Sequence, residues 1–201
     1  MKNIRFGALR LGAIALLLAT PAFGATSTFT GSLTGGAENP ATGSPGTGTT
    51  IVFYDSTLHT LRVSVSFSGL VGTTTASHIH CCAVAPLNAG VATQTPYFVG
   101  FPIGVTSGSY DHTLDLTQVS SFNPAYVTAN GGTAASAEIA LAAGMANGQS
   151  YLNIHTTTNP AGEIRAFLVL QSTEVPSLSH LGLGLLGLLM AAAGALALRR
   201  T

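Results

Sequence analysis

The sequence predicts an all-β fold, a Greek-key antiparallel β-sandwich or barrel of about seven strands with one or two short helices in the connections. Three observations favour this class. Short strand-like segments recur with turn residues between them, and helix-like segments do not alternate with them. Gly, Ser, Thr and Ala dominate together with β-branched Val and Ile, a composition typical of secreted all-β domains. Apolar and polar side chains alternate along residues 59–68, as they do in a half-buried antiparallel strand.

The first half of the chain is expected to supply four strands, at residues 27–34, 49–54, 59–68 and 75–81. Residues 35–48, between the first two, predict a loop because they are too rich in Gly, Pro and Thr for a core element. The second and third strands form a hairpin through Asp55-Ser56-Thr57. In the third strand the apolar side chains from Leu61 to Phe67 share one face, and the polar side chains lie on the other.

The second half is expected to supply the remaining strands, at residues 110–116, 149–156 and 163–171. A long irregular connection over residues 86–108 precedes them, and its aromatic side chains are expected to pack over an end of the core. Residues 119–130 and 133–146 are the helix candidates, and Gly148 follows the second in the position of a C-cap glycine. The last two strands form a hairpin through Asn159-Pro160-Ala161-Gly162.

The zero net charge of the full chain conceals an acidic central domain. Residues 25–175 contain two Arg and seven Asp or Glu residues, which gives a net charge of −5. Because nucleic acids and anionic lipids are bound by basic surfaces, this charge excludes nucleic acid as an expected partner.

Both ends of the chain are interpreted as targeting segments, with the β domain at residues 25–172. Residues 1–24 have the order of a signal peptide: a basic start with Lys2, Arg5 and Arg10, an apolar stretch, and a small-residue cleavage site. The apolar stretch is too short to span a bilayer. The chain is therefore predicted to be exported across the inner membrane.

Residues 173–201 predict a C-terminal sorting signal. Residues 181–198 form an uncharged apolar run that is long enough for a transmembrane helix, and Arg199-Arg200 would lie on its cytoplasmic side. With Val175-Pro176-Ser177-Leu178-Ser179 in front, the arrangement resembles the PEP-CTERM and IPTL-CTERM signals of Gram-negative bacteria. The resemblance implies that an exosortase-type enzyme processes this end, which would leave the domain at the cell surface or outside the cell after transient anchoring in the inner membrane.

Alternation places the polar side chains of three predicted strands on the same side. His78 and His80 flank Ile79, which is expected to face the core, so both imidazoles lie on the opposite face. The same reasoning applies to the last two strands. If the three strands are neighbours, one polar cluster forms on the outer face of the sheet. Its expected members are His78, His80, Asn153, His155, Glu163 and Arg165.

Two interpretations of this cluster remain open. Two histidines at positions i and i+2 of a strand lie roughly 6.5–7 Å apart at Cα and can grip one ion. His155 and Glu163 would complete three or four ligands suited to copper or zinc. Alternatively, the histidines bond to the neighbouring backbone or to Glu163, and with Asn153 and Arg165 they form a structural polar network.

The adjacent pair Cys81-Cys82 admits three interpretations: a vicinal disulfide, a thiolate pair that binds a soft metal, and an intermolecular bridge. We favour the vicinal disulfide in an exported protein. No Ser-His-Asp arrangement, phosphate-binding loop or paired carboxylate site is visible, so no catalytic residue is predicted and a non-enzymatic role is favoured.

Several motifs together resemble the CHRD domain, the module named from chordin. They are Gly35-Gly36-Ala37-Glu38-Asn39-Pro40, the stretch from Leu61 to Leu70, Ala76-Ser77-His78-Ile79-His80, the stretch from Asn147 to His155, and Gly162-Glu163-Ile164-Arg165. The resemblance implies an extracellular β-fold without established catalytic activity. It favours a cell-surface or matrix module that binds an envelope or matrix component. The alternative is an extracellular copper or zinc protein, with redox activity as one option, that uses the His-x-His strand.

Overall fold

The computed structural model describes residues 26–171, so the predicted signal peptide (1–24) and the predicted sorting signal (173–201, with the span 181–198) lie outside the described residues. Among the described residues, no helix is both long and apolar enough to cross a membrane. The strands are β1 (Thr26–Thr34), β2 (Thr47–Asp55), β3 (Thr60–Ser68), β4 (Thr74–Cys81), β5 (Gly108–Asp115), β6 (Ser150–Thr156), β7 (Ile164–Phe167) and β8 (Val169–Leu170). The helices are the 3₁₀ turns η1 (Gly35–Ala37) and η2 (Val119–Ser121), α1 (Pro124–Ala129) and α2 (Ala134–Ala146).

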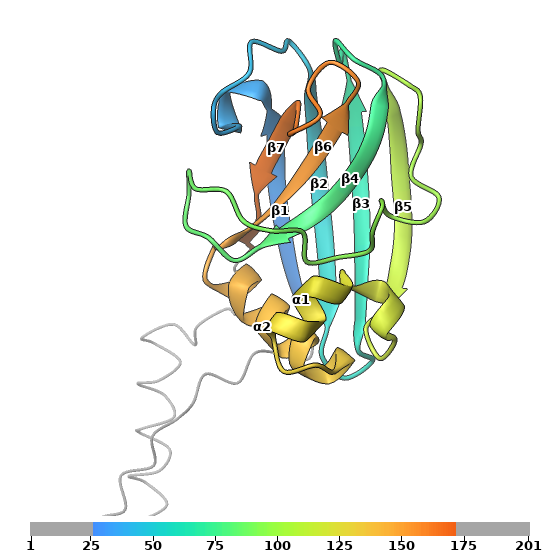
Figure 1. The fold of residues 1–201 in the computed structure, drawn as a ribbon, viewed down its shortest axis with the longest axis vertical. Helices are drawn as coiled ribbons and strands as arrows, with labels where there is room; N and C mark the ends of the chain where they lie inside the picture. Colours follow the sequence, from blue (N-terminus) through green and yellow to red (C-terminus); the bar gives the residue numbers. More distant parts are fainter. Residues whose placement is uncertain (1–25, 172–201) are drawn as a thin grey trace, which may run out of the picture.

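All eight strands belong to one antiparallel sheet with the order β4-β6-β7-β1-β2-β3-β5, and β8 pairs with β1. The sheet curls into a half-barrel, so that β4 and β6 lie in front of β2 and β3 (Figure 1). At the start of the two edge strands, β4 and β5, Thr74 donates a backbone hydrogen bond to Val105 O, and Leu70 donates one to Thr106 O in the segment before β5. The predicted all-β antiparallel fold is confirmed, with a single curled sheet as its framework.

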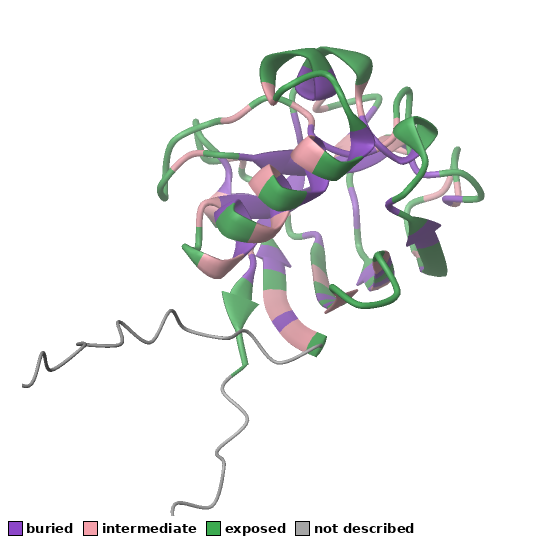
Figure 2. Ribbon diagram, turned by 90° about the horizontal axis from the view of Figure 1, so that it is seen from below, coloured by how far each residue is buried: buried purple, intermediate pink, exposed green. Residues whose placement is uncertain are grey.

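The apolar core fills the concave side of this sheet. The predicted alternation in β3 places Leu61, Val63 and Val65 there, each at most 2% exposed. Ile79 of β4 and Ile154 of β6 face them from the other part of the sheet and are fully buried. The helices close one end, and the view from this end shows buried positions inside and exposed positions on the outer turns (Figure 2).

The helix α2 agrees with its predicted range, and α1 is shorter than predicted. Thr133 caps α2 by a reciprocal capping box with Ser136, and Gly148 follows the helix with a left-handed φ of 66°. The expected helix over residues 119–130 is divided into η2 and α1. Asn123 caps α1 by accepting a hydrogen bond from Ala125 N, and Pro124 occupies the first helical position, where its missing N–H costs nothing.

The outer face of β4, β6 and β7 differs from expectation because it is not exposed. Glu163 and Arg165 were expected to face outward, but both are 0% exposed, and His78 is only 5% exposed. Residues 35–46 and 82–104 cover this face, and groups in both segments hydrogen-bond to its side chains. Alternation assigns side chains to one side of a sheet, but it cannot report that loops cover that side.

Candidate metal centre

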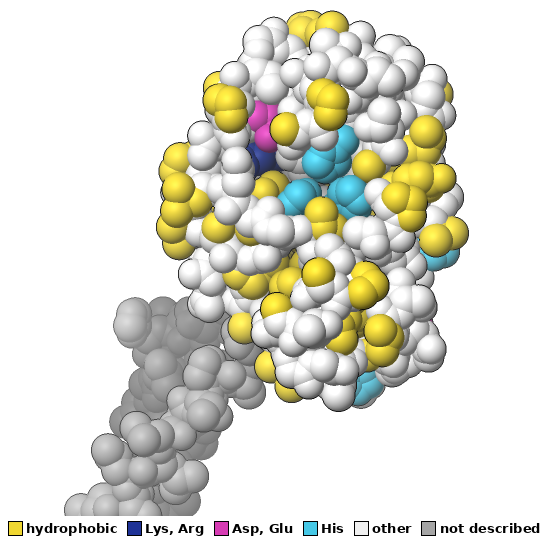
Figure 3. All heavy atoms as spheres, viewed as in Figure 1, with side chains coloured by type: hydrophobic (Ala, Val, Ile, Leu, Met, Phe, Trp, Pro, Cys, Tyr) yellow, Lys and Arg dark blue, Asp and Glu magenta, His cyan; other side chains and the backbone are white. Residues whose placement is uncertain are grey.

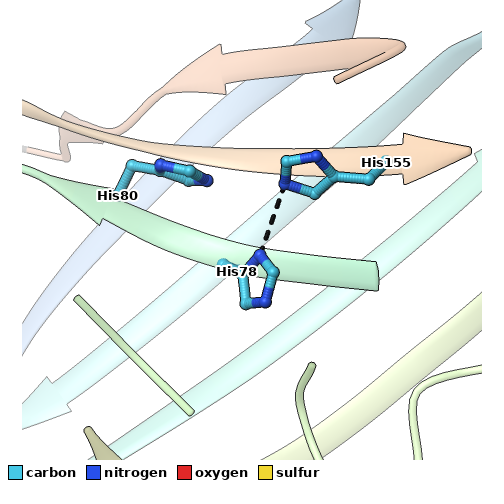
Figure 4. A group of neighbouring side chains, drawn as sticks. All are labelled: His78, His80 and His155. Atoms are coloured by element: carbon cyan, nitrogen blue, oxygen red, sulfur yellow. Dashed lines mark hydrogen bonds between the residues drawn. The ribbon is translucent and has the colours of Figure 1, made fainter. Parts of the chain in front are cut away.

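Two neighbouring strands bring three histidines together. His78 and His80 come from β4 and His155 from β6, and their rings point toward one another (Figure 4). In the β4–β6 register, Ala76 pairs with His155 and His78 pairs with Asn153, so the three histidines occupy one face. One ring nitrogen from each lies within 4.8 Å of the others. The convergence expected from alternation is therefore present.

The second nitrogen of every ring is fixed by a backbone carbonyl. His78 Nε2 lies 2.7 Å from Pro96 O, and His80 Nδ1 lies 2.9 Å from Ala89 O. His155 Nδ1 lies 2.9 Å from Pro160 O. Because a carbonyl oxygen only accepts hydrogen bonds, each of these nitrogens carries the proton and donates it. In the neutral rings, His78 Nδ1, His80 Nε2 and His155 Nε2 are then unprotonated.

These unprotonated nitrogens face one another without a donor between them. His78 Nδ1 lies 3.3 Å from His155 Nε2, and His80 Nε2 is buried with no hydrogen-bond partner among the described residues. Burial lowers the pKa of both His78 and His80 to about 4, so neither ring supplies an extra proton at neutral pH. Three lone pairs therefore converge on one point, an arrangement that a cation would stabilise.

The dimensions fit a transition-metal ion. A metal–nitrogen bond of roughly 2.0–2.1 Å places two nitrogen ligands about 3.3–3.6 Å apart in tetrahedral or trigonal geometry. The His78–His155 separation of 3.3 Å already satisfies this, and His80 needs only a small side-chain movement. The carbonyl bonds supply the outer-shell support that metal-binding histidines usually have. Histidine side chains are visible from outside near the centre of the view in Figure 3, so histidine atoms reach the surface of the protein there.

Glu163 does not join the three histidines. Its carboxylate accepts hydrogen bonds from the Ser44 and Thr156 hydroxyls and from the backbone N–H groups of Val71 and Gly72. Burial raises the pKa of Glu163, but these four bonds outweigh it and hold the pKa below its usual value. The carboxylate thus ties the covering segment 35–46, through Ser44, and the turn between β3 and β4, through Val71 and Gly72, to the end of β6.

Asn153 and Arg165 form a polar network with Glu38, which was not among the expected members of the cluster. Asn153 Nδ2 donates to both oxygens of Glu38, and Arg165 Nε lies 3.9 Å from Glu38 Oε2. Burial raises the pKa of Glu38 to about 7 against the lowering effects of Arg165 and Asn153. The sequence did contain a signal for Glu38, because it lies in Gly35-Gly36-Ala37-Glu38-Asn39-Pro40, one of the motifs that resemble the CHRD domain.

Arg165 is connected to the histidines by an aromatic stack. Its guanidinium lies 4.7 Å from the centre of the Tyr151 ring, which stacks on the His80 ring at 4.8 Å and 7°. Tyr151 Oη accepts a hydrogen bond from Ala89 N and donates one to Ala89 O, the same carbonyl that fixes His80. The Arg165 guanidinium also donates to Asn88 and to Pro86 O. The stack and the covering loop therefore hold His80 in one orientation.

Two further groups lie away from the histidines. The sulfurs of Cys81 and Cys82 are bonded to each other, and they pack against Gly144 of α2. His59 Nδ1 lies 2.9 Å from the buried carboxylate of Glu138. Sequence reasoning missed this pair because it joins a turn to a helix far along the chain.

Comparison with known proteins agrees with the motif resemblance. No curated protein and no solved structure matches this chain. The profile of the CHRD domain matches residues 29–168. The match includes β2 to β7 and all of β1 except its first three residues, and β8 lies just beyond it. The chain belongs to the CHRD domain family.

Proposed function

We propose that this chain is an exported metal-binding module that holds a copper or zinc ion with His78, His80 and His155. One observation carries the proposal: each ring donates its N–H to a backbone carbonyl, and the remaining nitrogens converge. A structural network alone accounts for the three carbonyl bonds, but it leaves His80 Nε2 unpaired and two unprotonated nitrogens 3.3 Å apart. A bound ion resolves both.

Family membership supports a non-enzymatic extracellular binding role for the domain. The predicted signal peptide at residues 1–24 would export the chain from a Gram-negative cell. The PEP-CTERM-like tail at residues 173–201, with its apolar run at 181–198, would anchor it in the inner membrane until an exosortase-type enzyme processed it. The site would then act at the cell surface or outside the cell.

Metal analysis of the tag-free protein tests this function. The wild-type protein is expected to retain about one copper or zinc ion after gel filtration, and His78→Ala/His80→Ala is expected to lose it. His112→Ala is the matched control, because His112 is an exposed histidine on β5. A folded wild-type protein that binds neither metal would refute the proposal.

A second candidate function is binding of an envelope or matrix component without metal. Exposed apolar side chains on the covering loop favour it: Val84 and Leu87 are each 53% exposed, and Val99 is 62% exposed. Retention of the protein on isolated envelope fractions, with and without charge substitutions at these positions, tests this candidate independently of metal.

A further inference from the structure

We infer that the three-histidine site prefers monovalent copper, Cu(I), to Zn(II) and Cu(II), and that Arg165 is the residue that sets this preference. The inference deepens the proposed metal function and rests on it. It concerns which ion the site takes, and it can fail while metal binding itself stands.

The ligand set carries no negative charge. The converging group consists of three neutral imidazoles, and Glu163, the carboxylate nearest in sequence to His155, is occupied by its four hydrogen-bond donors. Zn(II) bound by three histidines takes a water molecule as its fourth ligand. Cu(I) is stable with three nitrogen ligands alone. The charge part of the desolvation cost grows with the square of the ionic charge, so a neutral, buried ligand set favours the monovalent ion.

A fixed positive charge lies behind one of these ligands. Arg165 is 0% exposed, and its guanidinium stays protonated at any physiological pH. The Tyr151 ring contacts both groups: the Arg165 guanidinium lies 4.7 Å from its centre, and the His80 ring stacks on it at 4.8 Å. Repulsion between this charge and a bound ion is twice as large for a divalent ion as for a monovalent one. Loops cover the polar side chains on this face of the sheet. Solvent therefore weakens the difference in repulsion between divalent and monovalent ions less than it would at an open surface.

Glu38 partly neutralises the charge of Arg165, so a substitution that removes the Glu38 charge should have the opposite effect to one that removes the Arg165 charge. Its carboxylate lies 3.9 Å from Arg165 Nε and is only 8% exposed. Replacing Glu38 with Gln keeps the shape and one donor–acceptor pair with Asn153 but removes the negative charge. The Arg165 charge then acts on the site with less compensation. The two substitutions should therefore change ion preference in opposite directions.

Competition titrations on the tag-free protein at pH 8 measure the preference. Cu(I) is presented anaerobically with ascorbate and bathocuproine disulfonate as the competing chelator, and Zn(II) and Cu(II) are titrated against chelators of known affinity. The wild-type protein is expected to bind Cu(I) at least about tenfold more tightly than either divalent ion. Arg165→Met is expected to narrow that ratio about tenfold, Arg165→Lys to keep it, and Glu38→Gln to widen it. Asp111→Asn, in an exposed ion pair, should leave it unchanged.

The outcomes separate the two proposals. Zn(II) or Cu(II) binding as tight as Cu(I), or a ratio that moves the same way in Arg165→Met and Glu38→Gln, overturns the inference and leaves the metal site intact. If Arg165→Met fails to fold by circular dichroism, Glu38→Gln and Arg165→Lys still decide the matter. Absence of binding for all three ions refutes the proposed function itself.

Discussion

Substitution of Glu163 with Gln tests the idea that one buried carboxylate fastens the loop of residues 35–46 and the turn between β3 and β4 to the sheet. Oε1 accepts hydrogen bonds from Ser44 Oγ and Val71 N, each at 2.6 Å. Oε2 accepts from Thr156 Oγ1 at 2.6 Å and from Gly72 N at 3.1 Å. Each oxygen therefore serves one hydroxyl and one backbone N–H. An amide nitrogen in place of either oxygen cannot accept, so one backbone donor loses its partner whichever way the Gln side chain is turned.

The expected loss is about 2–4 kcal/mol of unfolding free energy at pH 7. A buried donor left without a partner costs about 1–3 kcal/mol, and hydrogen bonds to a charged acceptor are worth about 1.5–3 kcal/mol each. Glu163 is 0% exposed, so water cannot replace the lost acceptor. The hydroxyls of Ser44 and Thr156 can rotate to accept from the new amide, which keeps the estimate below the sum of four bonds.

Urea unfolding between pH 3 and pH 7 measures this loss and its pH dependence. Because the pKa of Glu163 is lowered on folding, the wild-type protein has this stabilisation above the usual carboxylate pKa and loses it as the pH falls through the folded-state value. The Glu163→Gln variant should therefore have a lower unfolding free energy than the wild-type protein at pH 7. Its unfolding free energy should also fall less than that of the wild-type protein as the pH is lowered. Asp111→Asn is the control at an exposed ion pair and should change little. A loss of less than about 1 kcal/mol at pH 7 would refute the fastening role.

Three other substitutions test separate parts of the structure. Burial raises the pKa of Glu38 to about 7, so the wild-type protein should lose stability as the pH rises from the usual carboxylate pKa to about 7, and Glu38→Gln should flatten this trend in melting temperature. Gly144→Ala should destabilise the fold by about 1–3 kcal/mol in chemical unfolding, because the new Cβ would collide with the Cys81 and Cys82 sulfurs. Thr133→Ala should cost about 1 kcal/mol and speed amide exchange in the first turn of α2, because it removes the N-cap.

Local patterns predicted the elements that depend on neighbouring residues. The alternation from Leu61 to Phe67 gave the correct core face of β3, and its hairpin with β2 is confirmed. The end of α2 follows from Gly148, because a left-handed residue after a helix favours glycine. The shared face of His78 and His80 is a property of any strand. These features need no knowledge of the rest of the fold.

Long-range contacts account for what the sequence did not predict. The pairing of β4 with β6 joins segments about 75 residues apart, and nothing in either segment specifies the other. The covering loops have no periodicity, yet their carbonyls at Ala89 and Pro96 fix the histidine rings. Glu38 lies in one of these loops, so its approach to Arg165 depends on how the loop folds back over the sheet. Burial of the outer face follows from the same loops.

The unprotonated nitrogens of His78, His80 and His155 connect the fold to the proposed function. A buried polar layer is costly unless its groups are paired. Here backbone carbonyls and the side-chain carbonyl of Asn88 satisfy Arg165, and backbone carbonyls satisfy one nitrogen of each histidine ring. These partners come from the protein itself, so the rings are oriented before any ion arrives. The cost of ordering the ligands is then met during folding rather than during binding. A site built in this way should keep its fold without metal, which is why metal content and folding can be measured separately in the His78→Ala/His80→Ala variant.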